Sequence, residues 1–319
     1  MAMDSHFLVS FAVCCCLACS GNSARSASGP GDAKEIEWNT ARESTPKAVD
    51  WALDVLPAEA AMLVLDWEAA SASELGRATT ALIVKGNADS VEGLSDAVYG
   101  LEECELFAMP QVSAVAISLR DELAPNVSSG TMGTGRGAVA FRGLSSPLLE
   151  ECLAIDAVTT APGSLWRYPV SDSEPGVHGR WSDNGSLLLS PQVEAFSAPV
   201  ARTDSVMSDL SSRLPKAAFL WIFGRPGPDL RAMGVDAIYF AYDRSGKSQY
   251  YTLRFSDRDR ASVFASARET DFAKESADPN SPDFESVFDV EHSGFYVMLK
   301  ETYSPEKLKR FLSSISQTN

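Results

Sequence analysis

Two carboxylates, Asp66 and Glu68, stand two residues apart in Asp66-Trp67-Glu68, at the end of an expected strand. Side chains two residues apart share one face of a strand, so these would lie about 7 Å apart. That separation suits the acid and base of an inverting glycoside hydrolase, which lie roughly 6.5–9.5 Å apart. Such enzymes draw the two groups from separate elements around a cleft. We therefore favour a strand end that turns into solvent and keep glycan hydrolysis as the alternative.

Histidine is too sparse for the usual hydrolytic and zinc sites. Outside the first nineteen residues only His178 and His292 remain. Residues 292–294 do not resemble a nucleophile elbow, and no ligand spacing fits zinc. The glycine-rich segment 130–137 precedes an expected strand and lacks the Lys-Ser/Thr pair of a phosphate loop, which predicts a mobile hairpin loop. We expect no metal and no cofactor.

Aromatic residues form the more interesting group. Trp166 and Tyr168 alternate on one expected strand, and Trp181 follows across a turn between Ser171 and Gly179. Aromatic rings on a solvated sheet face can stack on sugars or peptides. Alternating aromatics also fill sheet cores, which is the more common arrangement. Trp166, Tyr168 and Trp181 are therefore candidate ligand contacts, with core packing as the alternative.

Four of the six cysteines lie within the first nineteen residues, which leaves Cys104 and Cys152 for the folded part. Each of these two ends a Leu-Glu-Glu-Cys tetrapeptide. An oxidising compartment permits a disulfide between them. Two separate buried thiols on amphipathic helices are the alternative.

The chain opens with an apolar run of about twelve residues, Phe7 to Ala18, which is too short to span a bilayer but fits a signal segment. Cys16-Leu17-Ala18-Cys19 resembles the lipobox of bacterial lipoproteins. It departs from that pattern because Cys16 stands where Leu is preferred and no Lys or Arg precedes the run. The resemblance implies cleavage after residue 18, a lipid on Cys19 and, from Ser20, sorting to the outer membrane. An ordinary secretory signal or a misplaced start codon is the alternative.

Composition limits the partners. The chain has 319 residues, 45% of them hydrophobic, which suffices for a sizeable core, and its net charge is −16. Nucleic-acid binding depends on Lys and Arg that neutralise phosphates, and anionic lipid attracts the same residues. We therefore expect no nucleic-acid partner, and contact with the membrane only through the lipid on Cys19.

An internal repeat organises the rest. Residues 19–50 form an expected flexible tether, rich in small and charged residues, with a reach of about 30 Å. After the tether, Leu56–Trp67 resembles Leu214–Arg225, because each is Leu-Pro, a polar step and an apolar strand. Val112–Arg120 parallels Val235–Arg244, and Phe141 and Phe255 differ by 114 positions, as do Ser190 and Ser304. We expect a signal at 1–18, one repeat over 51–205 and a second over 206–319.

Element patterns favour an α+β fold. Runs rich in β-branched and aromatic residues predict strands at 137–141, 250–255 and 295–300. Helical periodicity predicts helices at 89–106 and after Ser304, and Ser256 with Asp259 suits a helix start. Short links imply antiparallel pairing. We expect two related halves, each an antiparallel sheet with helices packed on one face.

This layout resembles an uncharacterised class of exported bacterial proteins in which Leu-Pro openings precede repeated strand-helix units. The resemblance brings no catalytic residues. The sequence therefore predicts a lipoprotein at the outer membrane or periplasmic face of the envelope, with a non-catalytic binding or scaffolding role toward an envelope polymer or protein. An envelope glycan hydrolase that uses Asp66 and Glu68, and an assembly subunit, are the alternatives.

Overall fold

The structure is a computed structural model of the chain, and it describes residues 45–78, 80, 112–119, 123, 137–144, 165–168, 177–182, 185–190, 192–275, 277 and 287–316. The strands are β1 (Ala61–Asp66), β2 (Ala114–Leu119), β3 (Val139–Arg142), β4 (Leu165–Tyr168), β5 (Val177–Trp181), β6 (Ser186–Ser190), β7 (Ala218–Gly224), β8 (Val235–Asp243), β9 (Ser248–Phe255), β10 (Val287–Ser293) and β11 (Tyr296–Thr302). The helices are α2 (Lys47–Val55), α3 (Trp67–Ser71), η2 (Val193–Phe196), η3 (Ala201–Thr203), α7 (Ser205–Ser211), α8 (Pro228–Ala232), α9 (Arg258–Glu275) and α10 (Pro305–Ser316).

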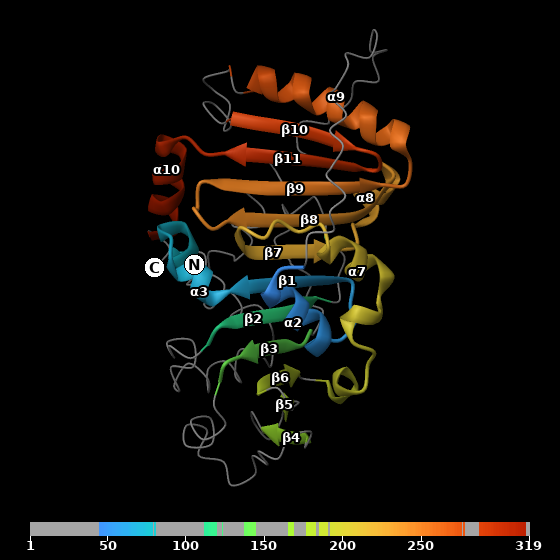
Figure 1. Cartoon of the computed structure of the whole chain (residues 1–319), viewed down its shortest axis with the longest axis vertical. Coiled ribbons are helices and arrows are strands. Elements are labelled where there is room, and N and C mark those ends of the chain that lie inside the picture. The colour runs from blue at the N-terminus through green and yellow to red at the C-terminus, as the bar shows by residue number, and fades with distance from the viewer. Residues whose placement is uncertain are drawn as a thin grey trace, which may run out of the picture.

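All these strands join one antiparallel sheet in the order β10-β11-β9-β8-β7-β1-β2-β3-β6-β5-β4 (Figure 1). Its centre is the pair β1 and β7, where Leu63 lies opposite Ile222 and Val64 opposite Trp221. A mixed fold with a large antiparallel sheet and few helices confirms the α+β prediction. The sheet is continuous, because backbone groups of β1 and β7 that would otherwise form edges bond to each other.

The core lies on both faces of this sheet. Leu63 and Leu65 of β1 face one buried cluster, and Met62 and Val64 face the other. In β7, all seven residues are buried. A strand covered on both faces has no polar side to expose, so its sequence reads as a continuous apolar run. That explains the run at the start of each predicted repeat.

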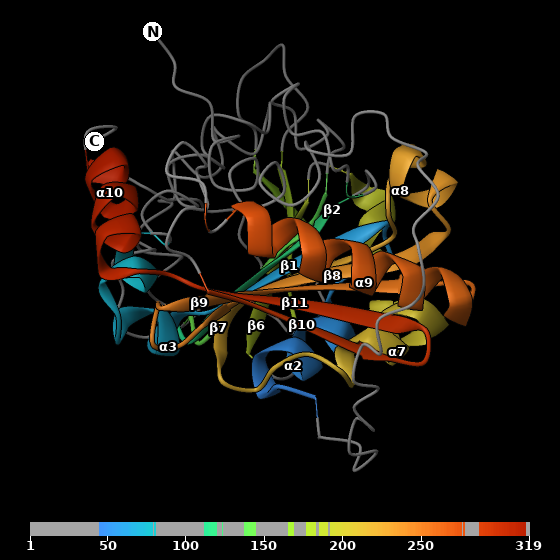
Figure 2. The same ribbon diagram turned by 90° about the horizontal axis from the view of Figure 1, so that it is seen from above.

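Helices contribute buried residues to both core clusters. Residues of α2 and α7 pack in the cluster that contains Met62, and residues of α8 and α9 pack in the cluster that contains Leu63. Figure 2 shows α2 and α7 on one side of the sheet and α8 and α9 on the other. The prediction of helices on one face is wrong for the described residues, because the apolar central strands need cover on both faces.

The predicted local elements are mostly close to the observed ones. The three predicted strands correspond to β3, β9 and β11, and α10 follows Ser304, whose hydroxyl accepts the N–H of Lys307 at 3.1 Å. Helix α9 exists, but Asp257 and not Ser256 caps it, by accepting the backbone N–H groups of Asp259 and Arg260. The helix predicted at 89–106 lies outside the described residues.

The folded part begins within the predicted tether. Helix α2 starts at Lys47 and buries Ala48 and Val49 in the core, so residues 47–50 belong to this helix and not to a tether. Residues 1–44, and with them Cys19, lie outside the described part of the chain, as do Cys104 and Cys152. Among the helices that the structure describes, none is long and apolar enough to cross a membrane.

Candidate functional site

A hollow of about 320 Å³ lies at one end of the central strands β7, β8 and β9. It is lined by residues of the β7–β8 connection, the start of β8 and the residue after β9: Arg225, Pro226, Arg231, Gly234, Val235, Asp236 and Ser256. The charged residues of this lining are two arginines, Arg225 and Arg231, and one aspartate, Asp236. We name this space the arginine hollow.

Two glycines shape the connection between β7 and β8. A Cβ atom on Gly224 would lie 2.5 Å from the carbonyl oxygen of Ala60, so only glycine permits the close approach of β7 to the start of β1. Gly234 has φ +87°, a left-handed conformation that favours glycine, and its carbonyl accepts the N–H of Ser256 at 2.9 Å. The bond between Ser256 and Gly234 joins the end of β9 to the start of β8, and both residues line the arginine hollow.

One wall is Arg225. Its backbone N–H donates to Ala60 at 2.8 Å, and its guanidinium donates to the carboxylate of Asp204. Asp204 is the N-cap of α7, where it also accepts the N–H groups of Val206 at 2.9 Å and Met207 at 3.2 Å. Burial would raise the pKa of Asp204, but the hydrogen bonds from Arg225 and from this backbone outweigh it and lower that pKa below its ordinary value. The carboxylate therefore stays charged and holds Arg225 in place.

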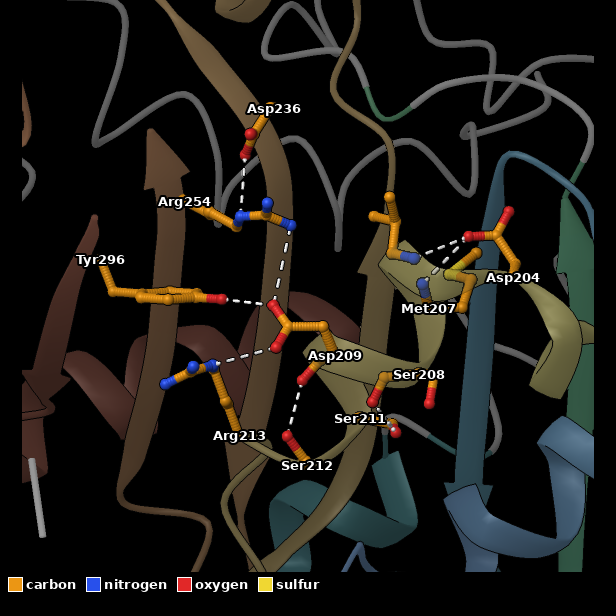
Figure 3. A network of polar contacts seen from close by, with 11 residues as sticks. Asp204, Met207, Ser208, Asp209, Ser211, Ser212, Arg213, Asp236, Arg254 and Tyr296 are labelled. Carbon is orange, nitrogen blue, oxygen red and sulfur yellow. Dashed lines mark hydrogen bonds and ion pairs between the residues drawn. The ribbon is translucent and has the colours of Figure 1, made fainter. Parts of the chain in front are cut away.

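Asp236 also lines the arginine hollow, and it begins a polar network toward α7 (Figure 3). Arg254 lies between two carboxylates, with Nε 3.4 Å from Asp236 and Nη1 3.6 Å from Asp209. The hydroxyl of Tyr296 donates to Asp209 at 2.5 Å, and the guanidinium of Arg213 lies 4.1 Å from the centre of the Tyr296 ring. The network thus ties α7 to β8, β9 and β11.

Burial controls the protonation of this network. It raises the pKa of Asp236 above its ordinary value, although the charge of Arg254 acts in the opposite direction. Burial also raises the pKa of Tyr296 above its usual range, and the hydrogen bond to Asp209 adds to that shift. Tyr296 therefore remains a neutral donor at physiological pH.

A further guanidinium, that of Arg260, lies beside Gly234, which lines the arginine hollow. The side chain of Arg260, at the start of α9, runs so close to Gly234 that a Cβ atom there would lie 2.7 Å from its Nη1. Two arginines, Arg225 and Arg231, therefore line the hollow, and a third, Arg260, lies beside the lining residue Gly234. Guanidinium groups bind carboxylates and phosphates through paired N–H donors, so this arrangement suits binding.

The predicted carboxylate pair has a different geometry. Strand β1 ends at Asp66 and Trp67 starts α3, so the prediction that Asp66 and Glu68 share a strand face is wrong. Asp66 caps α3 by accepting the N–H of Ala69 at 2.9 Å, and it pairs with Arg244 at 3.2 Å. Glu68 lies exposed in the first turn of that helix.

The histidines lie far apart in the sheet. His178 is on β5 and His292 on β10, near opposite ends of the strand order. A ring nitrogen of His292 lies 3.0 Å from the carbonyl oxygen of Gly294. Within the described ranges, no group of three or more His, Cys, Asp or Glu residues could hold a metal ion.

Of the three aromatic residues predicted to contact a ligand, Trp181 is wrong, because it is buried. Strands β4 and β5 form the expected hairpin, with position 166 opposite Gly179. Trp181, two residues after Gly179, is only 4% exposed and packs in the core cluster that contains Phe141. Its ring therefore serves the core. Trp166 and Tyr168 remain a prediction as ligand contacts.

Sequence reasoning missed the arginine hollow. It treated Gly224 to Gly234 only as a short connection between two strands, although Arg225 and Arg231 stand within it. The one available signal was this pair of arginines around Pro226-Gly227-Pro228 in an acidic chain. The carboxylate partners come from other elements, which no local pattern relates to this loop.

Comparisons with known proteins add little. No protein-family model matches the chain, and no curated protein matches it. Among solved structures, one described as crystal form I of TP0453 is similar with a TM-score of 0.43 and 7% identity, over 83% of this chain and 97% of that chain.

Proposed function

We propose that this protein is an exported, lipid-anchored protein of the bacterial envelope with a non-catalytic binding role. The observation that carries the binding role is the arginine hollow, whose walls are held by ion pairs on neighbouring elements of the sheet. Anchoring rests on Cys16-Leu17-Ala18-Cys19.

The proposal includes two related halves, which the strand pairing supports. On either side of β1 and β7 the order is alike: β2, β3, β6 and β5 on one side, and β8, β9, β11 and β10 on the other. Leu63 pairs with Ile117 as Ile222 pairs with Phe240, and each central strand follows a short helix, α2 or α7. A twofold relation through the central pair accounts for this order.

The same pairing corrects the predicted alignment. Ile117 pairs with Val139, and Phe240 pairs with Tyr251, so Val139 corresponds to Tyr251 at a difference of 112 and not 114. An irregularity in β7 between Ala218 and Leu220 displaces the alignment of β1 with β7 by one further residue. Such insertions keep apolar side chains on the correct face while they displace a sequence alignment.

The anchoring part is tested by lipid labelling in the bacterial cell. The chain should take up labelled fatty acid and fractionate with membranes, and Cys19→Ser should abolish both. Cys15→Ser, within the segment that is cleaved off, is the matched control and should change neither. A full-length chain that keeps Met1 and carries no acyl group would refute lipid anchoring.

The binding role is tested with purified peptidoglycan as the polymer. We expect the chain to sediment with the polymer and to release no soluble fragments, because Asp66 is engaged by α3 and Arg244. Fragment release that disappears in Asp66→Asn would favour the hydrolase alternative and contradict the non-catalytic role.

A further inference from the structure

We propose that one face of the outer strands β9, β11 and β10 is a docking surface for a partner protein, which contributes a short segment with an apolar side chain next to a lysine or arginine. This inference goes beyond the arginine hollow and rests on the two related halves of the proposed function. It follows from what covers the corresponding face in the other half, and from one charge that differs between the halves. We name this surface the outer face, and it consists of Tyr250, Asp289, Glu291, Met298 and Lys300.

The outer face lies on the side of the sheet where α2 and α7 cover the central strands. Val297 and Leu299 belong to the cluster that contains Leu63, so Met298 between them points to the other side. The cluster on that other side, which contains Met62, includes no described residue of β10 or β11. Helix α9, which packs against these two strands, lies on the opposite side from α2 and α7 (Figure 2). The outer face is therefore open within the described part of the chain.

The corresponding face of the other half is covered by the chain itself. Leu188 of β6 is only 3% exposed, and Ala195 and Phe196 of η2 pack against the cluster to which it belongs. Arg180 of β5 donates to the carbonyl oxygen of Phe196 at 2.8 Å, and its guanidinium lies 5.3 Å from the centre of that ring. A short segment with an aromatic side chain thus fits this face of the fold, and a cation holds it.

Strand pairing relates the two faces residue by residue. Positions in β3 and β9 correspond at a difference of 112, as Val139 and Tyr251 do. Neighbouring strands then present their side chains in the same order: Ala140, Leu188 and Arg180 in the first half, and Thr252, Met298 and Glu291 in the second. Met298 therefore takes the place of Leu188, and Glu291 takes the place of Arg180.

In the second half the described chain supplies no such cover. After β6 the chain runs into η2, whereas after β11 it runs into α10. Leu308 and Leu312 of α10 pack against the cluster that contains Leu63, on the other side of the sheet. Met298 and Tyr250 consequently remain half-buried on the outer face. A partner segment in the place of η2 would remove this apolar surface from water.

Glu291 sets the chemistry of the partner segment. Arg180 donates to a carbonyl oxygen, but a carboxylate only accepts, so the segment on the outer face must bring a donor. Asp289 lies opposite Lys300, whereas Glu291 lies opposite the uncharged Met298 and forms no ion pair or hydrogen bond with the residues that the structure describes. A basic side chain would provide the donor and the charge. Pairing of β10 with β10 of a second copy would instead bring carboxylates together, which disfavours a second copy.

Peptides based on the cover of the first half test this proposal. The probes are fluorescently labelled peptides with the sequence of residues 192–200, made with Ser197→Arg or with Ser197→Glu. Ser197 is exposed and follows Phe196, whose carbonyl oxygen Arg180 contacts. Fluorescence anisotropy is measured with the full chain in a non-ionic detergent at low ionic strength. We expect the Ser197→Arg peptide to bind about threefold more tightly than the Ser197→Glu peptide, with a smaller difference at high salt.

Variants of the chain locate the surface. Glu291→Arg restores the cation of the first half and should invert the preference, so that the Ser197→Glu peptide binds more tightly. Met298→Ser should weaken binding of both peptides about fivefold, because apolar surface is lost. Glu269→Arg is the matched control on the exposed side of α9, and it should change neither affinity.

The inversion in Glu291→Arg cannot arise from unfolding, because an unfolded chain would not gain affinity for one peptide. An unchanged preference in this variant would overturn the proposal. No binding of either peptide to the full chain would overturn it as well, since the outer face would then be covered by a second copy or by the chain itself, or would not be a docking surface. Lipid labelling of Cys19 and sedimentation with peptidoglycan do not depend on Glu291, so the proposed function fails or stands separately.

Discussion

A buried ion pair beneath α10 gives the sharpest test of how the described core is held together. Lys307 lies in the first turn of α10 with its side chain 5% exposed, and its Nζ is 2.5 Å from Oε1 of Glu301, whose side chain is 2% exposed. The side chain of Gln249 donates to the other oxygen of Glu301. We predict that Lys307→Met destabilises the fold, because it removes the cation that lies against the buried carboxylate of Glu301.

The size of the effect follows from this burial. Removing one partner of a buried pair costs about 3–5 kcal/mol, because the remaining charge stays desolvated. Methionine keeps most of the apolar stem of Lys307, so little of that cost comes from lost packing. In a domain of this size, the melting temperature should fall by about 10 °C.

A second variant separates charge from packing. In Lys307→Met with Glu301→Leu, neither charge of this pair remains buried, so the free energy of unfolding should rise again above that of Lys307→Met. Lys309→Met is the matched control, because Lys309 is exposed on the same helix. It should change stability by less than about 0.5 kcal/mol.

The assay is urea denaturation at pH 7, followed by circular dichroism and by tryptophan fluorescence. The two signals should give the same midpoint, and the slope should stay unchanged across the variants. A midpoint for Lys307→Met equal to that of the original chain would refute the reasoning. A double variant less stable than Lys307→Met would refute the reasoning as well. The loss of stability in Lys307→Met would then come from lost packing and not from the buried charge of Glu301.

Two further predictions concern titration. Asp204→Asn keeps the helix cap but loses the charge that Arg225 contacts, so it should lower the free energy of unfolding by about 1 kcal/mol at neutral pH. Because the folded-state pKa of Asp204 lies below its ordinary value of about 3.9, its contribution is complete above that pH and is lost as the pH falls through the folded value. Denaturation of both proteins across pH should therefore show a constant difference above about pH 5 that vanishes in acid, and a difference that grows in acid would contradict it. Burial raises the pKa values of four tyrosines, which should ionise in the folded protein only above the ordinary value of about 10: Tyr239, Tyr242, Tyr250 and Tyr296. Ultraviolet absorbance titration checks this, and complete ionisation by about pH 10.5 in the folded state would disprove it.

Local patterns predicted most of the individual elements, because strands and helix caps depend on neighbours in the chain. Tyr250 to Phe255 falls within β9, and Ser304-Pro305 opens α10. The same patterns failed at Asp66, since a carboxylate after an apolar strand can either continue the strand or cap a helix. Asp66 caps α3, because the backbone N–H of Ala69 is within reach of its side chain. That choice depends on tertiary contacts such as the pair with Arg244.

The joining of the strands into one sheet could not be read from the sequence. The apolar runs at β1 and β7 are compatible with two separate cores or with one sheet whose centre is covered on both faces. The backbone pairing of Ala61 with Gly224 joins the two runs in a single sheet, and it requires a glycine at position 224. The arginine hollow depends on that pairing, because Arg225 follows directly after Gly224.

The two proposed halves carry opposite charges at one corresponding position, the end of the first strand of each half. If Leu63 corresponds to Ile222, as their shared pairing indicates, then Asp66 corresponds to Arg225. The first strand of one half thus ends in a carboxylate that caps α3 and pairs with an arginine, and the first strand of the other ends beside a guanidinium held by Asp204. A duplication followed by this change of charge would place the arginine hollow at one end of a sheet with twofold order.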